Sequence, residues 1–158
     1  MVGSVSGEVE VNAPAHVVWE LYRSLELLTI TKKGLDKIVD KIEVLEGDGS
    51  VGTLLQFSFH PGALPFSSYK EKFTKIDDEK MVKVVEVVEG GFLELGFKWY
   101  LVRLNVIAKD EKSCITKNTI EYELNEDSDP KLASVVSIDP LVAMMNIAAN
   151  HIVSGIKA

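Results

Sequence analysis

Apolar and polar positions alternate at the start of the chain and soon change to helical spacing. Residues 4–11 place valines and a glycine on one side and serine and glutamates on the other. This alternation is typical of a strand that has one face in water. Asn12 and Pro14 then supply a capping residue and a proline, which are typical of a helix start. Apolar residues recur at helical spacing over residues 17–28, and we expect a second short helix over residues 35–40.

The middle of the chain predicts one strand after another, separated by glycine, proline or charged turns. We expect six strands there, over residues 41–45, 53–59, 69–76, 81–89, 92–107 and 113–124, the fifth of them bent with a β-bulge at Gly96. Residues 130–156 return to helical spacing with an apolar stripe. Asp139 and Pro140 should kink or restart this helix.

These elements predict a single domain over residues 1–158 of the α+β class. An antiparallel sheet with one wet face must bury its other face, and the C-terminal helix is the only element large enough to cover it. We therefore predict a seven-stranded curved antiparallel sheet wrapped around that helix, with two short helices after the first strand. A curved sheet on one helix tends to leave an internal cavity, which is the usual site for a small ligand.

Two motifs in this region carry the most information, namely EGDGSVGT at residues 46–53 and YKEKF at residues 69–73. Three glycines around an acidic residue, between two apolar runs, predict a tight turn between strands. Neither GKS nor GKT follows and no helix signal is present, so the segment does not read as a phosphate loop. In the second motif, Tyr69, Glu71 and Phe73 share the face opposite the lysines and should point inward. A carboxylate that faces an interior must be paired, neutralised or functional.

Composition excludes several classes of function. The chain has 158 residues, 46% hydrophobic and 26% charged, with a formal net charge of −7 and a pI near 5.0. An acidic surface argues against a nucleic-acid partner, and it does not indicate an anionic membrane partner. We find no apolar run long enough to span a membrane, and the first residues do not read as a signal peptide.

Cysteine and histidine usage add two expectations. Cys114 is the only cysteine, so no intramolecular disulfide can form, and we expect a small buried side chain in a reducing, cytoplasmic setting. His16, His60 and His151 have no metal-ligand spacing with one another or with Cys114. We therefore expect neither a metal nor another cofactor.

The order of elements, with EGDGSVGT after the second strand, resembles the plant pathogenesis-related class ten family, the family of the major birch pollen allergen. This resemblance covers essentially the whole chain. The segments YKEKF, VVEGGFLELGF (residues 87–97) and SCITKNTIEYEL (residues 113–124) are similar to its norcoclaurine synthase branch and the neighbouring norbelladine synthase. The resemblance implies an enzyme of alkaloid biosynthesis that condenses an aromatic amine with an aldehyde, by imine formation or a Pictet–Spengler reaction. Phytohormone-binding relatives share the glycine loop and VEGG, so the alternative is a non-catalytic intracellular carrier of a cytokinin, flavonoid or alkaloid.

The resemblance also implies site residues. It places the catalytic phenol of the branch at Tyr69, its carboxylate at Glu71 and its lysine at Lys83. A further catalytic aspartate of the branch falls on Val102, so the chain departs from the norcoclaurine synthase pattern there. The pattern around Lys83 does not separate the two faces of its valine-rich strand, and composition alone favours an exposed lysine. A structural ion pair between Glu71 and Lys83 is the other plain interpretation.

These residue types suit the chemistry that the resemblance implies. Iminium formation needs a donor that protonates the leaving hydroxyl of a carbinolamine, and ring closure needs a base. An apolar cavity disfavours the charged form of a lysine, which brings its pKa towards working pH. We assign Lys83 as proton donor, Glu71 as base and Tyr69 as positioner. The partner is a small aromatic or hydrophobic molecule in the cavity, the protein is a monomer or weak homodimer, and the expected ligand-binding residues are Phe73, Tyr100, Val102, Leu141 and Met145.

Overall fold

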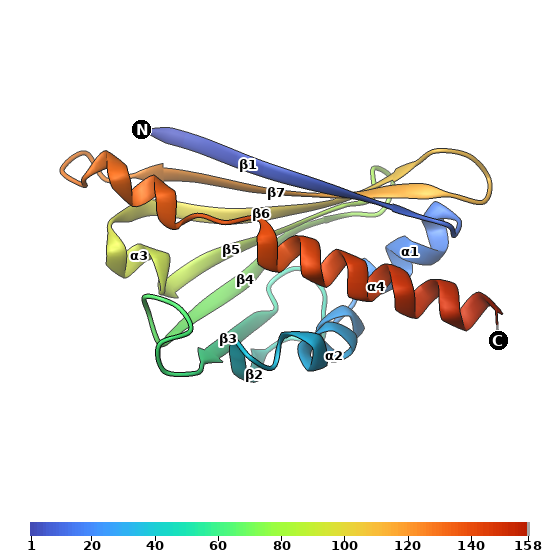
Figure 1. Cartoon of the computed structure of the whole chain (residues 1–158), viewed down its shortest axis with the longest axis horizontal. Helices are drawn as coiled ribbons and strands as arrows, with labels where there is room; N and C mark the ends of the chain where they lie inside the picture. Colours follow the sequence, from blue (N-terminus) through green and yellow to red (C-terminus); the bar gives the residue numbers. More distant parts are fainter. Residues whose placement is uncertain (158) are drawn as a thin grey trace.

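The centre of the computed structural model, which describes residues 1–157, is a seven-stranded antiparallel sheet that curves around one long helix (Figure 1). The strands are β1 (Val2–Val11), β2 (Val39–Glu46), β3 (Leu54–Phe59), β4 (Ser68–Asp77), β5 (Val82–Gly90), β6 (Phe97–Ala108) and β7 (Cys114–Leu124). Their order across the sheet is β1-β7-β6-β5-β4-β3-β2, so β1 and β2 form the two edges. The predicted architecture is confirmed.

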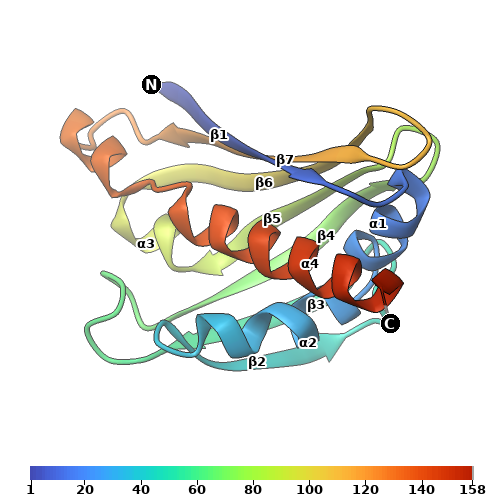
Figure 2. The ribbon, with the colours of Figure 1, turned by 45° about the vertical axis from the view of Figure 1, so that its right-hand side comes forward.

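The helices cover one face of this sheet (Figure 2). They are α1 (Ala15–Tyr22), α2 (Glu26–Lys32), α3 (Phe92–Leu95) and α4 (Asp139–Lys157), with 3-10 segments η1 (Lys33–Leu35) and η2 (Pro130–Val135). In both ribbon views α4 runs along the concave face of the sheet, and α2 lies at the β2–β3 end. Helix α2 therefore lies next to α4 on the same side of the sheet.

The two helices after β1 lie earlier in the chain than the pattern predicts. The apolar spacing over residues 17–28 suggested one helix, but α1 ends at Tyr22 and α2 begins at Glu26. Ser24 separates them, because its hydroxyl donates to the Leu21 carbonyl and accepts from the Glu26 amide. The expected helix over residues 35–40 is wrong, since Val39 already begins β2. Side-chain capping by serine competes with helix continuation, and here it wins over the apolar pattern.

The strand expected over residues 92–107 is shorter than predicted. Residues Phe92–Leu95 form the single turn α3, and β6 begins at Phe97. Gly96 is not the bulge itself but ends this turn with a φ of 123°, a conformation that side-chain-bearing residues rarely adopt. The irregularity in the β6–β7 ladder lies between Phe97 and Trp99.

The C-terminal helical region is divided, as Asp139 and Pro140 led us to expect. The segment η2 ends at Val135, and α4 restarts at Asp139 with Pro140 in its first turn. By length and composition, the segment Pro130–Ile156 is apolar enough to cross a membrane, which corrects the expectation that no such run exists. In the structure, Met144, Met145 and other residues of α4 belong to the apolar core beneath the sheet.

The glycine loop between β2 and β3 is a turn between strands, as predicted. Gly47, Gly49 and Gly52 all have positive φ, between 90° and 108°. The loop folds onto β4, because the Gly52 amide donates to the Phe73 carbonyl over 2.8 Å. It therefore fixes the register of the strand that carries Glu71.

Strand register builds the floor of the concave face. Phe73 pairs with Val85, which pairs with Val102 of β6. One row further along, Lys83 pairs with Leu104 of β6. Because side chains alternate between the two faces of a strand, these residues all point towards α4, and the lysines of YKEKF point outward.

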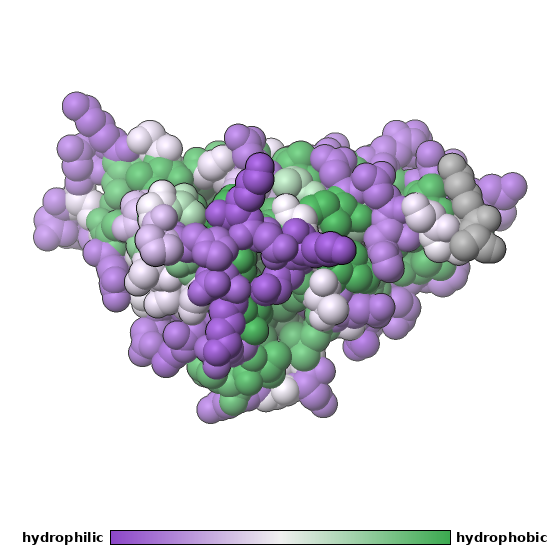
Figure 3. Space-filling model, turned by 60° about the horizontal axis from the view of Figure 1, so that its bottom comes forward, coloured by the Kyte–Doolittle hydropathy of each residue, from purple (hydrophilic) through white to green (hydrophobic). Residues whose placement is uncertain are grey.

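On the face shown in Figure 3, hydrophilic side chains surround areas of hydrophobic ones. Apolar side chains reach the surface between polar ones on the face shown. Exposed large apolar residues include Val44 and Leu45 on the edge strand β2 and Val51 in the glycine loop. Isolated apolar residues of this kind are normal on soluble proteins.

Helix α4 approaches β1 closely at Gly7. A Cβ atom at this position would lie 2.8 Å from Cγ2 of Val142 and 3.2 Å from Cγ1 of Ile138. Val142 lies in the first turns of α4 and Ile138 directly precedes the helix, and both are branched side chains, so an added methyl group would force them to shift.

We therefore expect Gly7→Ala to lower the free energy of unfolding by about 1–2 kcal/mol, because overpacking at a tight contact is destabilising. Gly155→Ala is the matched control, since nothing lies within 4 Å of a Cβ at that helical position. Its stability should be unchanged or slightly higher. Urea denaturation of both variants measures the difference, and equal stabilities would contradict the close contact.

Candidate active site

A cavity of about 200 Å³ lies between the sheet, α2 and α4. Its floor is formed by residues of β2 to β6, and its other walls come from α2, η1, the β3–β4 loop, α3 and the segment from the end of η2 to the start of α4. The lining residues are Leu27, Leu28, Thr31, Lys32, Leu35, Ile38, Val39, Ile42, Phe57, Phe59, Leu64, Phe66, Tyr69, Glu71, Phe73, Lys83, Val85, Phe92, Tyr100, Val102, Leu104, Val135, Ser137, Pro140, Leu141 and Met144. Most of them are apolar, so the few polar groups define the chemistry of the cavity.

The structure brings together every residue predicted for the site except one. Tyr69, Glu71, Phe73, Lys83, Tyr100, Val102 and Leu141 all line the cavity. The prediction for Met145 is wrong, because this side chain is fully buried in the core and approaches Gly7 of β1. Its neighbour Met144 lines the cavity instead, three residues after Leu141 and therefore on the same side of the helix.

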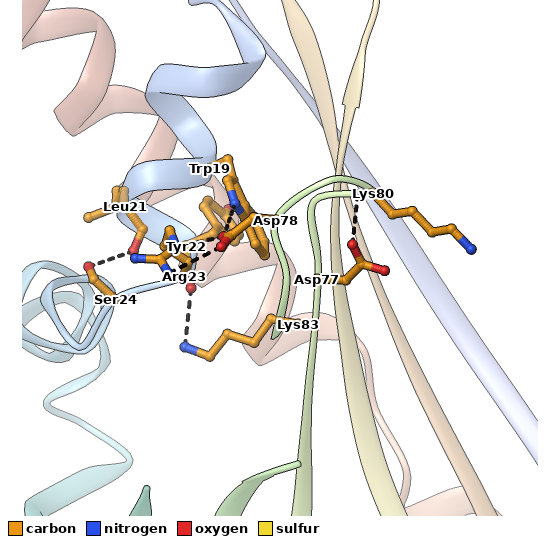
Figure 4. Close-up of polar contacts among 9 residues, drawn as sticks. All are labelled: Trp19, Leu21, Tyr22, Arg23, Ser24, Asp77, Asp78, Lys80 and Lys83. Atoms are coloured by element: carbon orange, nitrogen blue, oxygen red, sulfur yellow. Dashed lines mark hydrogen bonds and ion pairs between the residues drawn. The ribbon is translucent and has the colours of Figure 1, made fainter. Parts of the chain in front are cut away.

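Lys83 extends from β5 towards the end of α1 (Figure 4). Lys83 is only 3% exposed, and its Nζ donates to the carbonyl oxygen of Tyr22 over 3.1 Å. The same Nζ lies 3.9 Å from the centre of the Phe73 ring, which is a cation–π distance. Removal from water lowers the pKa of Lys83 from 10.5 to about 8, although the nearby Glu71 carboxylate acts in the opposite direction. The interpretation of Lys83 as an exposed lysine is therefore wrong.

Glu71 faces the same cavity from β4. The residue is buried, and desolvation raises the pKa of its carboxyl group from 4.5 to about 7, with Lys83 partly opposing the shift. No ion pair within 4.0 Å joins Glu71 to a described residue. The interpretation of Glu71 and Lys83 as a structural ion pair is therefore wrong as well. Each group shifts the pKa of the other through its charge, and both line the cavity without a direct bond between them.

Aromatic rings form the wall next to Glu71. Tyr69 lies 5.2–5.3 Å, centroid to centroid, from Phe57 and Phe59, and Phe92 stacks on Tyr100 at 3.8 Å. Burial raises the pKa of both tyrosine hydroxyls, and the charge of Glu71 adds to the effect. Both phenols therefore stay protonated and can orient an oxygen atom by hydrogen bonding.

Several lining residues were not predicted from the sequence. Phe57 and Phe59 could have been found, because they alternate with the polar residues Gln56 and Ser58 in β3 and so share its inward face. Phe66 and Ser137 lie outside regular elements and Thr31 lies in the short helix α2, so none of them was indicated by a periodic pattern. Their place in the wall depends on how α2 and the β3–β4 loop pack.

Val102 lies on β6, in the cavity floor. It pairs with Val85 on one side and Ile120 on the other. The floor at this point is therefore entirely apolar, and the titratable side chains around the cavity are Tyr69, Glu71, Lys83, Tyr100 and Lys32.

Residues outside the cavity offer little other chemistry. Cys114 is fully buried, and desolvation raises the pKa of its thiol to about 11, so it stays neutral. Within residues 1–157, no group of three or more His, Cys, Asp or Glu residues is placed to hold a metal ion.

Comparison with known proteins agrees with this geometry. The model of the pathogenesis-related protein Bet v 1 family matches residues 1–155. Norbelladine synthase from Narcissus pseudonarcissus is 40% identical over 152 residues, which cover 96% of this chain and 93% of that enzyme. S-norcoclaurine synthase 2 from Papaver somniferum is 34% identical over 92% of this chain, but the match spans only 63% of the poppy enzyme.

A solved structure of norcoclaurine synthase from Thalictrum flavum, in complex with dopamine and hydroxybenzaldehyde, superposes with a TM-score of 0.85. It is 31% identical, and the alignment covers 98% of this chain and 88% of that one. The solved enzyme thus has the same fold with an amine and an aldehyde bound.

The burial of Lys83 predicts a specific dependence of stability on pH. Below about pH 8 the folded protein must keep a buried ammonium, whereas the unfolded chain keeps it in water. Between about pH 8 and about pH 10.5 only the unfolded state holds this proton, so stability rises with pH for this group.

We therefore expect the parent to gain up to about 3 kcal/mol in free energy of unfolding relative to Lys83→Met across this range, since one pKa unit corresponds to 1.36 kcal/mol. The difference between the two proteins cancels the titration of all other groups that the substitution does not affect. Urea denaturation at about pH 7.5, 9 and 10 measures it. A constant difference would show that Lys83 is not desolvated in the fold.

Proposed function

The chain belongs to the pathogenesis-related Bet v 1 family, and from this premise we propose that it is a norcoclaurine synthase-like enzyme of alkaloid biosynthesis that condenses an aromatic amine with an aldehyde. The observation that carries the proposal is the pair Lys83 and Glu71. Both side chains are desolvated in one apolar cavity, their pKa values lie near 8 and near 7, and they are not bonded to each other. Groups with such pKa values can donate and accept protons at neutral pH.

The reaction can be assigned to these groups step by step. The amine nitrogen attacks the aldehyde carbon to give a carbinolamine. Lys83 donates a proton to its hydroxyl group, which leaves as water, and an iminium ion forms. If the ring then attacks the iminium carbon in a Pictet–Spengler closure, Glu71 accepts the proton that the ring carbon loses. Tyr69 positions an oxygen atom of the substrate through its phenol.

The cavity walls favour aromatic partners for this chemistry. Phe57, Phe59, Tyr69 and Phe92 present rings that can pack against a flat substrate. The apolar floor at Val102 offers no acid to a catechol, so the chain has one acid fewer than the norcoclaurine synthase pattern implies.

A second candidate is a non-catalytic carrier of a small hydrophobic molecule such as a cytokinin, flavonoid or alkaloid. The observation that favours it is the almost entirely apolar lining, including Val102. The two candidates separate in one experiment, a mass-spectrometric product screen that pairs dopamine, tyramine and tryptamine with several aldehydes. A parent protein that binds these aromatic molecules but yields no product with any pair is a carrier.

We expect Lys83→Met to lower turnover by about a hundred- to ten-thousand-fold, which is the usual worth of positioned proton transfer. Methionine keeps most of the volume of the lysine stem, so the fold and ligand binding should persist. Lys72→Met is the matched control, because Lys72 lies on the exposed face of β4 and should keep parental turnover. Parental turnover in Lys83→Met would remove the proposed role of this residue.

We expect Val102→Asp to raise activity with dopamine relative to tyramine, because an aspartate at the floor can accept a hydrogen bond from the additional catechol hydroxyl. Val102→Asn is the control for size without charge. The buried carboxylate should also cost some stability, which thermal denaturation measures. If the folded aspartate variant has the parental dopamine-to-tyramine ratio, Val102 does not face the amine ring.

A further inference from the structure

The hydrogen bond that holds the Lys83 ammonium comes from outside the sheet. Its acceptor is the carbonyl oxygen of Tyr22, the last residue of α1. Carbonyl groups at a helix C-terminus have no partner within the helix and carry partial negative charge, so they suit an ammonium group. The position of Lys83 in the cavity therefore depends on where α1 ends.

The end of α1 is attached to the turn between β4 and β5 through a single aspartate (Figure 4). Trp19 Nε1 donates to Oδ1 of Asp78 over 2.9 Å, and Arg23 Nε donates to the same oxygen over 2.8 Å. Arg23 Nη2 also approaches Oδ2 of Asp78 at 3.5 Å. Trp19 is buried, so its ring anchors this contact in the core. We call Trp19, Arg23 and Asp78 the Asp78 clasp.

The Asp78 clasp and the hydrogen bond of Lys83 connect the same two parts of the molecule. Asp78 lies in the turn before β5, and β5 is the strand from which the Lys83 side chain extends towards Tyr22. The hydrogen bond between Lys83 and Tyr22 therefore connects α1 to β5. The bonds from α1 to Asp78 connect α1 to the turn before β5, which is a second connection between the same parts of the molecule. Loss of the clasp would let α1 and the β4–β5 turn move apart, and the carbonyl would move with α1.

The clasp also changes the charge that Lys83 experiences. The Arg23 guanidinium lowers the pKa of Lys83 by repulsion, and Glu71 raises it. Asp78 lies against Arg23 and so offsets part of its positive charge. The other titratable groups that line the cavity are Lys32 of α2 and the two phenols. The residues of α4 that line it, Pro140, Leu141 and Met144, are uncharged.

We propose that Trp19, Arg23 and Asp78 are positioning residues that hold the Tyr22 carbonyl against the Lys83 ammonium and thereby control proton transfer from this lysine. The effect of the clasp on turnover rests on the proposed function, but its effect on the titration of Lys83 does not. Stability alone does not explain the arrangement, because the Asp78 side chain is 63% exposed and exposed ion pairs contribute little.

Three variants separate charge from attachment. Asp78→Asn keeps the Oδ1 acceptor and removes the negative charge, Asp78→Ala removes both, and Arg23→Gln removes the positive charge. The matched controls are Arg103→Gln and Glu121→Gln, which break a 3.0 Å ion pair of the same kind between β6 and β7, away from the cavity. All substitutions are made in the full chain, and the exposed positions should leave the fold intact.

The primary measurement is the titration of the Lys83 amine, followed by NMR of protein labelled at lysine Cε and Nζ and assigned with Lys83→Met. We expect Arg23→Gln to raise the pKa of Lys83 and Asp78→Asn to lower it, each by about half a unit, because both charges are partly screened by water. Both controls should titrate as the parent does. In each variant, the pH at which the rate of the condensation changes should move in the same direction as the pKa of Lys83.

The second measurement is the effect on kcat and KM for an amine–aldehyde pair that the parent converts. Asp78→Ala should lower kcat at least about tenfold, and more than Asp78→Asn, while KM changes little, because attachment is lost in addition to charge. If the clasp variants and the controls leave the Lys83 titration equally unchanged, or if Arg23→Gln and Asp78→Asn shift it in the same direction, the proposal is overturned. Should the parent yield no product, the proposed enzyme function fails while the NMR titration still decides the role of the clasp.

Discussion

The cavity depends on one constraint, which is that an ammonium and a carboxylate must stay out of water without neutralising each other. Burial alone would drive Lys83 and Glu71 to discharge or to form a direct ion pair. The fold avoids the direct ion pair by giving the lysine a separate partner, the Tyr22 carbonyl, and an aromatic face, the Phe73 ring, while burial moves both pKa values towards neutrality. Glu71, on the neighbouring strand, then keeps its oxygens free towards the cavity. The curvature of the sheet, the early end of α1 and the glycine loop on β4 all serve this separation.

Most of the fold follows from alternation along the chain, because strands with one wet face repeat every second residue. The same rule placed Tyr69, Glu71 and Phe73 on the inward face correctly. It failed for Lys83, since valine occupies both faces of β5 and the pattern there has no period; only the family resemblance indicated that this lysine is buried. Helix boundaries failed where a side chain competes with the backbone, as Ser24 does between α1 and α2.

The side of the cavity opposite the sheet, formed by α2, α4 and the β3–β4 loop, is called the upper wall, and its residues were the hardest to predict. One residue along a helix rotates the side chain by about 100°, so the stripe on α4 identified the helix but assigned Met145 in place of Met144. Phe66 and Ser137 lie outside regular elements and reach the cavity only through packing. Local sequence pattern therefore predicts which residues line the floor, because strand register fixes the direction of each side chain. It predicts the residues of the upper wall poorly, because tertiary contacts decide which of them reach the cavity.

This division between floor and upper wall has a consequence for how such a protein can diversify. The groups proposed to transfer protons, Glu71 and Lys83, lie on β4 and β5, and each of these strands pairs with a neighbour on both sides. The side chains of α2, α4 and the β3–β4 loop that complete the cavity contact the floor through packing, and they can change one at a time. Natural drift or laboratory evolution can therefore explore new substrates through substitutions in the upper wall and leave the reactive machinery intact. A family built on this plan can acquire many ligands from a single inherited chemistry.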